Sequence, residues 1–457
     1  MKRQQVLGLV LAAICGLTGA PARALTKKIS LEMAVERARH NPLAQAALEQ
    51  KRAASAQLDE ARGHRYPTAT VTALVAPSPR IDCPDMDTTN PDCTHTSPTS
   101  LGFHFKGVMG SVKAELTQPL YTFGKIDSAI DAASNNVQMN EALANGVAGD
   151  MGLEAARAYL GVDLARELGG MLDEGSEKLA DATKTLEDRL AKGDSSVTVQ
   201  DRLRLQTFTA ELASRRSEAR EAEATALAGL RALVGDPEVD TLGDELEPLE
   251  VDIDQAKAYL ERAQQLRPET RAAEHGVSAL EGLRDLERAR LLPDLAVVGG
   301  ATWSHADGVT HPPSAFAYDP FNLTTGYAAL VLRWNIEPGT QFARLAQANA
   351  QVERGRDLLA AARRAGDFAV LQAYSRAVEA KSRLDSANTG EKSARGWVAS
   401  VMQADAIGTV SSRDMADAYL AYFTLHSRVL QSTYDYNLAI LALRRAIGES
   451  TLPPRKP

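Results

Sequence analysis

The side chains that could do chemistry are few and scattered. Two cysteines, Cys83 and Cys93, lie in a loop rich in turn-forming residues, with no histidine between them. In an exported protein such a pair can form a disulfide that closes the loop, which we favour over a metal site. The 8 histidines show no His-x-x-x-His spacing. The sequence also has no phosphate-binding loop and no nucleophile elbow, so we expect no enzymatic activity and no cofactor.

Two short segments combine glycine with helix-capping residues: Gly193-Asp194-Ser195-Ser196 and Gly408-Thr409-Val410-Ser411-Ser412. Each interrupts a long helical pattern, and glycine followed by serine is typical of a turn that starts a new helix. Asp414 and Asp417 follow the second turn. Because they are three residues apart, their carboxylates would lie on one face of a helix. From the residues alone, their simplest role is to stabilise the positive end of the helix dipole.

The first 24 residues have the pattern of a secretory signal peptide. Lys2 and Arg3 precede an apolar run at residues 6–17, and Ala22-Arg23-Ala24 supplies the small residues of a cleavage site. We expect cleavage after Ala24. The formal net charge then changes from −8 to −11, because three basic residues and no acidic residue are removed.

The composition argues against several classes of protein. Of the 457 residues, 44% are apolar and 24% are charged, which is typical of a folded rather than a disordered chain. The mean hydropathy of −0.24 is too low for a helical membrane transporter, which needs several apolar runs of about 20 residues. The acidic net charge and the lack of a long basic run argue against nucleic-acid binding.

The chain contains two copies of one plan. Pro42 corresponds to Pro268 at a displacement of 226 residues, and Leu230 corresponds to Leu443 at a displacement of 213. Most of the difference between these two displacements arises in the segment that holds the two cysteines, so the copies differ mainly in a loop. We predict a signal peptide (1–24), a first structural repeat (25–235), a linker (236–252), a second structural repeat (253–450) and a C-terminal tail (451–457).

Each copy predicts the same helices. A helix of about 35 residues comes first, a very long helix follows a β-hairpin, and a helix of about 38 residues returns. At 1.5 Å per residue the very long helix would span about 100 Å, which the two shorter helices of a copy match when placed end to end. Heptad spacings predict that these helices pack side by side in a long bundle. The expected bounds are 31–65, 125–192 and 197–234 in the first copy and 254–291, 340–407 and 411–448 in the second.

Four segments alternate apolar and polar residues with a period of two, which predicts β-strands. Their lengths of about 8–11 residues and their aromatic ends are typical of a membrane β-barrel, although a soluble hairpin packed on helices explains the pattern equally well. An open four-stranded sheet cannot lie in lipid, because its edges leave backbone groups unpaired. A membrane location therefore requires several copies of the chain to share one barrel. The segments are 68–75, 110–118, 295–303 and 327–334.

The order and spacing of these features resemble the TolC family of outer-membrane efflux proteins over about residues 28–450. The resemblance rests on the duplicated plan, on the segment Gln118-Pro119-Leu120-Tyr121-Thr122-Phe123-Gly124-Lys125, and on Gly408 followed by Asp414 and Asp417. It implies a mainly α fold with a membrane β-barrel. It also implies a homotrimer in which four strands per chain complete a twelve-stranded outer-membrane barrel, above a helical barrel that reaches about 100 Å into the periplasm.

The resemblance further implies a passive exit duct for a tripartite efflux pump or a type I secretion system. A periplasmic adaptor (a membrane fusion protein) and an inner-membrane pump or ABC exporter would open it. Asp414 and Asp417 would form two stacked carboxylate rings at a periplasmic gate, where they would attract cations and hinder anions. The adaptor would dock at the helical turns, on Gly193, Asp194, Ser195, Gly408, Thr409 and Val410.

One departure and one alternative accompany this interpretation. Family members often carry an arginine two residues after the second glycine and a tyrosine three residues before it, and these help to lock the closed state. Val410 and Asp405 occupy those positions here, and Arg413 is the nearby basic residue. The alternative function is a secreted periplasmic helical scaffold or adaptor without a membrane barrel.

Overall fold

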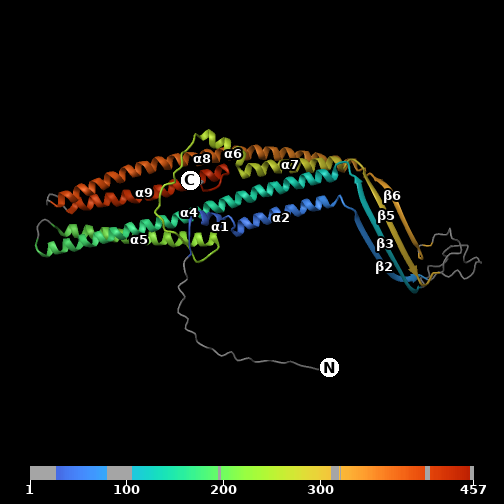
Figure 1. The fold of residues 1–457 in the computed structure, drawn as a ribbon, viewed down its shortest axis with the longest axis horizontal. Coiled ribbons are helices and arrows are strands. Elements are labelled where there is room, and N and C mark those ends of the chain that lie inside the picture. Colours follow the sequence, from blue (N-terminus) through green and yellow to red (C-terminus); the bar gives the residue numbers. More distant parts are fainter. Residues whose placement is uncertain are drawn as a thin grey trace, which may run out of the picture. The chain divides into compact units, whose positions relative to one another are not determined.

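A computed structural model describes residues 27–79, 105–193, 197–309, 319, 321–406 and 412–452. Figure 1 labels their helices and strands. These residues form two compact units. Within the described ranges, the first unit contains residues 27–41, 151–249 and 380–438, and the second contains residues 42–150, 250–379 and 439–452. Each unit therefore takes segments from both halves of the chain.

The first unit consists of helices and one pair of short strands. Its shorter elements are β1 (Lys27–Ile29), α1 (Leu31–Ala38), α5 (Val199–Val234) and β4 (Val239–Thr241). It also contains the later part of α4 (Lys125–Ala191), the later part of α8 (Pro338–Ala406) and most of α9 (Ser412–Ile447). Strands β1 and β4 pair in parallel. Strand β4 lies inside the segment 236–252, for which the sequence predicted no strand.

The core of the first unit forms around this strand pair. Ser30 caps α1, because its side chain accepts a hydrogen bond from the backbone N–H of Met33. The following turn of α1 then packs on α4, α5 and β4. The buried cluster consists of Ile29, Ala34, Tyr159, Leu230 and Val239.

The second unit contains the four long strands and the helices that lead into them. Its complete helices are α2 (Pro42–Gly63), α6 (Ala256–Leu266) and α7 (Pro268–Ala289). Its strands are β2 (Thr68–Pro79), β3 (Phe105–Tyr121), β5 (Asp294–Ala306) and β6 (Thr324–Arg333). The early parts of α4 and α8 and the end of α9 complete it.

Two helices that the sequence predicted as continuous are broken at prolines. The predicted helix 31–65 is divided into α1 and α2 before Pro42, and the predicted helix 254–291 is divided into α6 and α7 before Pro268. Proline lacks a backbone N–H and disfavours helical backbone in the preceding residue. Arg267 is accordingly extended, with φ −62° and ψ 119°. This part of the prediction was wrong.

The very long helices and the returning helices agree with the prediction. α4, α5, α8 and α9 begin and end within two residues of the expected bounds. Small buried residues allow helices to approach closely, as where Gly282 of α7 lies against the backbone of Ala132 of α4. Among the described residues, no helix has an 18-residue stretch apolar enough to cross a membrane.

The four predicted strands form one antiparallel sheet in the order β2–β3–β5–β6. Residues that pair across neighbouring strands lie on the same face of the sheet. The register of pairing therefore determines which side chains share a face, and whether that face is apolar or polar. One face is apolar and consists of Ala69, Val71, Ala73, Val75, Val112, Ala114, Leu116, Leu295, Val297, Ala301, Trp303, Ala328, Leu330 and Leu332. The other face is mainly polar and includes Thr68, Thr70, Thr72, Ser111, Lys113, Glu115, Thr117, Thr302, Ser304 and Thr325.

Candidate functional site

The first turn of α5 is fixed by a reciprocal capping arrangement. The Thr198 hydroxyl accepts a hydrogen bond from the backbone N–H of Asp201, at 3.3 Å. The Asp201 carboxylate in turn accepts hydrogen bonds from the backbone N–H of Thr198, at 2.9 Å, and from its hydroxyl, at 2.7 Å. These hydrogen bonds lower the pKa of Asp201, and the positive charges of Arg204 and Arg413 lower it further. Because the cap satisfies free N–H groups, it determines where α5 begins.

The predicted aspartates lie in the first two turns of α9. Asp414 is exposed and belongs to the first turn, where a negative charge stabilises the helix dipole. Asp417 lies one turn later, and its carboxylate accepts a hydrogen bond from Nη2 of Arg204 on α5, at 2.5 Å. The two side chains are 34% and 39% exposed. One of the two predicted aspartates is therefore held by a guanidinium of the other returning helix in the same chain.

The two ends of this ion pair occupy corresponding positions of the two sequence repeats. Arg204 and Asp417 are 213 residues apart, the displacement that relates Leu230 to Leu443. The same displacement relates Asp201 to Asp414. The sequence analysis named only the two aspartates of the second copy for this site, so it did not include Arg204. The displacement of 213 was the signal that identifies the arginine.

The starts of α5 and α9 therefore carry a mixed set of charges, which we call the charged cluster: Asp201, Arg204, Arg413, Asp414 and Asp417. It combines three carboxylates with two guanidinium groups, a net charge of −1 in each chain. The predicted site contained only the two negative charges of α9. This region is therefore less acidic than the two predicted aspartates alone would make it. One of its negative charges, on Asp417, takes part in a contact between α5 and α9.

Several predicted residues lie outside the described residues. They are Asp194 and Ser195 of the first turn, Gly408, Thr409 and Val410 of the second turn, and the two cysteines Cys83 and Cys93. Gly193 is described and lies two residues after the end of α4. Its φ of +76° is in the left-handed region, which glycine adopts without strain and other residues rarely adopt.

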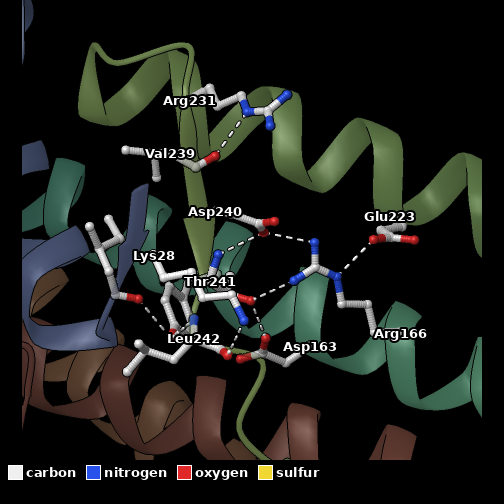
Figure 2. A network of polar contacts seen from close by, with 11 residues as sticks. Lys28, Asp163, Arg166, Glu223, Arg231, Val239, Asp240, Thr241 and Leu242 are labelled. Atoms are coloured by element: carbon white, nitrogen blue, oxygen red, sulfur yellow. Dashed lines mark hydrogen bonds and ion pairs between the residues drawn. The ribbon is translucent and has the colours of Figure 1, made fainter. Parts of the chain in front are cut away.

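A second polar cluster attaches strand β4 to α4 and α5 (Figure 2). Arg166 of α4 donates hydrogen bonds to Glu223 of α5 at 2.7 Å, to Asp240 at 2.7 Å and to the Thr241 hydroxyl at 3.0 Å. The Thr241 hydroxyl donates in turn to the Asp163 carboxylate, at 2.7 Å. One arginine therefore joins two helices and a strand.

Burial changes the acidity of two groups in this cluster. It raises the pKa of Asp163 to about 6, although the hydrogen bond from Thr241 and the charge of Arg166 act in the opposite direction. It also raises the pKa of Tyr159 to about 12. The Tyr159 hydroxyl donates to the carbonyl of Ile29 and accepts from the N–H of Leu242, so it connects β1 to the chain that follows β4.

The same segment is also attached to α9. The side chain of Asn437, which is 2% exposed, donates to the carbonyl of Glu247 at 2.8 Å and accepts from the N–H of Leu249 at 2.8 Å. The N–H of Leu246 donates to the carboxylate of Glu167 on α4. The segment between the repeats is therefore held by side chains of both long and returning helices.

Within the part of the chain that the structure describes, no group of three or more His, Cys, Asp and Glu side chains is arranged to hold a metal ion. The charged groups near the starts of α5 and α9 instead pair with each other, as Arg204 does with Asp417. These charges can attract or repel an ion that comes near them. The ion pair between Arg204 and Asp417 can also hold α5 and α9 together.

Comparisons with known proteins give a family for part of the chain and a fold for nearly all of it. Residues 259–449 match the sequence model of the family described as "Outer membrane efflux protein". No curated protein sequence matches the chain.

Several solved structures share the fold. A membrane protein from Pseudomonas aeruginosa is 18% identical, with a TM-score of 0.73 over 96% of this chain and 99% of that chain. The outer-membrane channel OprN is 18% identical, with a TM-score of 0.73 over 93% of this chain and 91% of that chain. The CmeC outer membrane channel of Campylobacter jejuni is 15% identical, with a TM-score of 0.72 over 97% and 94%. The resemblance found in the sequence is thereby confirmed: residues 259–449 match the outer membrane efflux protein family, and the chain has the fold of solved outer-membrane channels.

Proposed function

We propose that this chain is the outer-membrane exit channel of an export system. Three copies would share one membrane barrel made of their strands, and their helices would form a conduit through the periplasm. The observation that carries this proposal is the four-stranded sheet. Its apolar face is exposed, and its two long edge strands pair with no further strand within the described residues.

The apolar face of the sheet is open. Val71, Val75 and Leu330 are 69%, 76% and 64% exposed, although all three lie on this face. A soluble antiparallel sheet normally buries its apolar face against a core. An apolar face toward lipid and a polar face toward an aqueous lumen is the arrangement of outer-membrane barrels. The alternative, a soluble scaffold whose hairpins pack on its own helices, would have buried this face.

The edges of the sheet point to an oligomer. The edge strands β2 and β6 have 12 and 10 residues, and neither pairs with a further strand within the described residues. Unpaired backbone groups cannot lie in hydrocarbon. Pairing β2 of one copy with β6 of the next would close the sheet, and three copies would supply twelve strands, more than the roughly eight of the smallest membrane barrels. We therefore infer a homotrimer in contact with outer-membrane lipid.

Helices of the second unit also carry large apolar side chains on their surface. Phe342 and Phe368 of α8 are 61% and 67% exposed, and Leu43 of α2 is 63% exposed. Large exposed apolar side chains of this kind mark surfaces that pack against another molecule. In a trimer these faces of α8 and α2 would be buried between neighbouring copies.

Transport through such a channel would be passive. A periplasmic adaptor would dock at the helical turns near Gly193 and Gly408, and an inner-membrane pump or ABC exporter would supply the energy. Asp414 and Asp417 would form the periplasmic gate. The two sequence repeats, 25–235 and 253–450, would each contribute one hairpin and one set of helices to the shared wall, joined by the linker 236–252.

Tryptophan fluorescence in lipid tests the membrane location. The chain has 3 tryptophans, of which Trp303 lies on the apolar face of the sheet and Trp397 lies on α8 in the first unit. Two variants would each keep one of these two residues, with phenylalanine at the other tryptophan positions. In vesicles of lipid with brominated acyl chains, we expect strong quenching of Trp303 and none of Trp397.

Conductance tests the channel itself. The purified full chain should insert into a planar lipid bilayer and give discrete ion-conducting steps. Recovery of the whole protein from the periplasm without detergent, together with absence of quenching at Trp303, would rule out the channel in favour of the soluble scaffold.

A further inference from the structure

The four long strands meet their helices at one end of the sheet (Figure 1). We call this end the helix-side border, and in the proposed channel it faces the periplasm. Large apolar and aromatic side chains are exposed there: Tyr66, Tyr121, Leu292, Trp334 and Ile336. Exposed tyrosine and tryptophan are typical of the level at which lipid headgroups lie. The helix-side border is therefore the place where phosphates of the periplasmic leaflet would contact the protein.

Trp334 connects the apolar face of the sheet to the end of α7. It comes two residues after Leu332, so it continues the alternation that puts Leu330 and Leu332 on that face. Its indole N–H donates a hydrogen bond to the carbonyl of Leu291, at 3.0 Å. The N–H of Leu291 donates in turn to the carbonyl of Arg288, at 3.2 Å. Arg288 therefore lies within one helical turn of an aromatic side chain at the edge of the lipid-facing surface.

The start of α8 brings a second arginine to the same place. The Gln341 side chain donates to the carbonyl of Arg290, at 3.4 Å. Arg344 lies three residues later, on the same side of α8. Farther along the two helices, Arg356 of α8 pairs with Glu281 of α7 at 2.6 Å, so α7 and α8 run side by side. Arg344 therefore lies beside the end of α7.

These two arginines are available to a ligand. Arg288 and Arg344 are both exposed, and neither forms an ion pair within the described residues. Arg290 pairs with Glu287 at 2.5 Å. With Glu337 as the other acid, the three arginines leave one surplus positive charge in each chain. The remaining charged groups nearby are engaged or lie on the other face of the sheet: Arg284 pairs with Asp285, Lys125 pairs with Asp294, and Arg333 lies on the polar face.

The helix dipole explains only one of the two arginines. A base in the last turn of α7, such as Arg288, is favoured by the negative end of the dipole. Arg344 lies in the second turn of α8, near the positive end, where the dipole gives no such benefit. A ligand that both arginines bind would account for the pair.

The corresponding junction of the first repeat lacks this feature. Gln118 of the apolar face donates to the carbonyl of Arg65 at 3.0 Å, so the end of α2 also meets the helix-side border. Its arginines, however, are already paired, Arg62 with Asp59 at 3.2 Å and Arg65 with Asp127 at 2.6 Å. The two exposed arginines without an ion pair are therefore particular to the second repeat.

We infer that Arg288 and Arg344 bind the phosphate of an anionic glycerophospholipid in the periplasmic leaflet, with Trp334 against the upper part of its acyl chains. Guanidinium groups suit this ligand because their N–H groups match the oxygens of a phosphate. Phosphatidylglycerol carries one negative charge, which balances the one surplus positive charge of the chain. The inference rests on the proposed function, because the site continues the apolar face that the proposed function places in lipid. It adds which lipid the channel selects.

Quenching of Trp334 by brominated lipid tests the site. The reporter is the full chain with Trp303→Phe and Trp397→Phe, in phosphatidylcholine vesicles at low salt. A minor fraction of the lipid is phosphatidylglycerol or phosphatidylcholine with bromine near the headgroup end of its chains. We expect phosphatidylglycerol to be preferred about fivefold, which is the effect of one arginine charge near an anionic surface. The preference should disappear when Arg288→Gln and Arg344→Gln are combined.

Two sets of variants serve as controls. Arg271→Gln combined with Arg354→Gln should keep the preference, because these exposed arginines belong to the same two helices but lie away from the helix-side border. A parallel set that keeps only Trp303 reports insertion of every variant, since Trp303 lies on the apolar face. Both brominated lipids should quench Trp303 equally.

The outcomes separate the lipid site from the channel. Absence of quenching of Trp303 would overturn the proposed function, and the site with it. If Trp303 is quenched, the channel stands, and the site is overturned by equal quenching of Trp334 by the two lipids or by a preference that survives without Arg288 and Arg344. Loss of the preference in the control variants would overturn it as well. Inorganic phosphate that abolishes the preference, where chloride at equal ionic strength does not, would assign the arginines to a free anion instead of a lipid.

Discussion

The side chain of Arg445 on α9 lies against Gly149 of α4, where a Cβ atom would come within 2.9 Å of the arginine Cδ and Nε atoms. Arg445 is 8% exposed, and its Nη2 donates to the carbonyl of Gly146 at 2.9 Å and to Glu269 of α7 at 2.7 Å. Its Nε lies 2.8 Å from Asp150. The glycine therefore makes room for a buried arginine that joins three helices of the second unit.

Replacing this glycine by alanine is expected to destabilise the protein. In Gly149→Ala the new methyl group must displace the arginine, which typically costs about 1–3 kcal/mol. The measurement is the free energy of unfolding in urea, followed by circular dichroism of the detergent-solubilised chain.

Gly169 of the same helix is the control, because an added Cβ there meets nothing within 4 Å. Gly169→Ala is expected to raise the free energy of unfolding by about 0.5–1 kcal/mol, since alanine is the better helix former. Equal effects of the two substitutions would show that Arg445 does not need the space at Gly149.

The buried carboxyl of Asp163 should make stability depend on pH. Burial raises its pKa to about 6 in the folded protein, above the ordinary value of 3.8 for an aspartate. Below about pH 3 the group is protonated in both states and costs nothing. Between about pH 4 and 6 it ionises in the unfolded chain but stays largely protonated in the folded protein, so by pH 7 the folded state has lost roughly 3 kcal/mol.

Asp163→Asn should remove this loss and keep an oxygen that accepts the Thr241 hydroxyl. We expect the variant to be more stable than the wild type at pH 7.5, with a difference that shrinks below pH 6 and disappears near pH 3. The midpoint of urea unfolding at several pH values measures it. Asp181→Asn, at an exposed position of the same helix, should show no such trend. A pH-independent difference for Asp163→Asn would contradict the assignment.

The cap of α5 should control the order of the region near the charged cluster. Thr198→Ala removes the hydroxyl that accepts from the N–H of Asp201 and is expected to cost about 1 kcal/mol. Hydrogen exchange in the first turn of α5 should become faster. Thr207→Ala, in the middle of the same helix, removes a hydroxyl that bonds only the carbonyl of Leu203 among the described contacts and should leave that turn unchanged. Unchanged exchange in Thr198→Ala would mean that other contacts determine where α5 begins.

The two aspartates of the proposed gate should act on ions through their charge. Asp414 is exposed and Asp417 accepts a hydrogen bond from Arg204. Replacing both by alanine should weaken block by divalent cations, by about two- to tenfold in the half-blocking concentration, because two negative charges per chain are lost. Asp414→Asn and Asp417→Asn alone should each account for part of that change. Unchanged conductance and block in the double variant would remove both residues from the constriction.

Local patterns in the sequence were sufficient for the long elements. α4 and α8 were predicted within two residues because helical periodicity, glycine and capping residues act over a few neighbouring positions. The strands were predicted because a period of two is equally local. The break before Pro268 was missed because the apolar pattern continues across it, although the proline itself carried the physical reason.

Long-range contacts account for what the sequence analysis missed. Arg204 and Asp417 are 213 residues apart, and Thr241 lies 78 residues from its partner Asp163. No pattern of neighbouring residues predicts that such groups meet, because the meeting is decided by how the helices pack. The duplication shows that Arg204 and Asp417 occupy corresponding positions of the two repeats, but it does not show that their side chains are in contact.

The sequence by itself therefore determined the two very long helices, the two returning helices, the four long strands, the two repeats and the family resemblance, since all of these depend on local spacing or on repetition. Only the tertiary structure decided that the apolar face of the sheet is left open, that the segment between the repeats is fastened to α4 and α9, and that an arginine holds one of the two aspartates. These depend on which surfaces meet and which remain without a partner in one chain. That is a property of packing, and packing brings together residues that sequence spacing keeps apart.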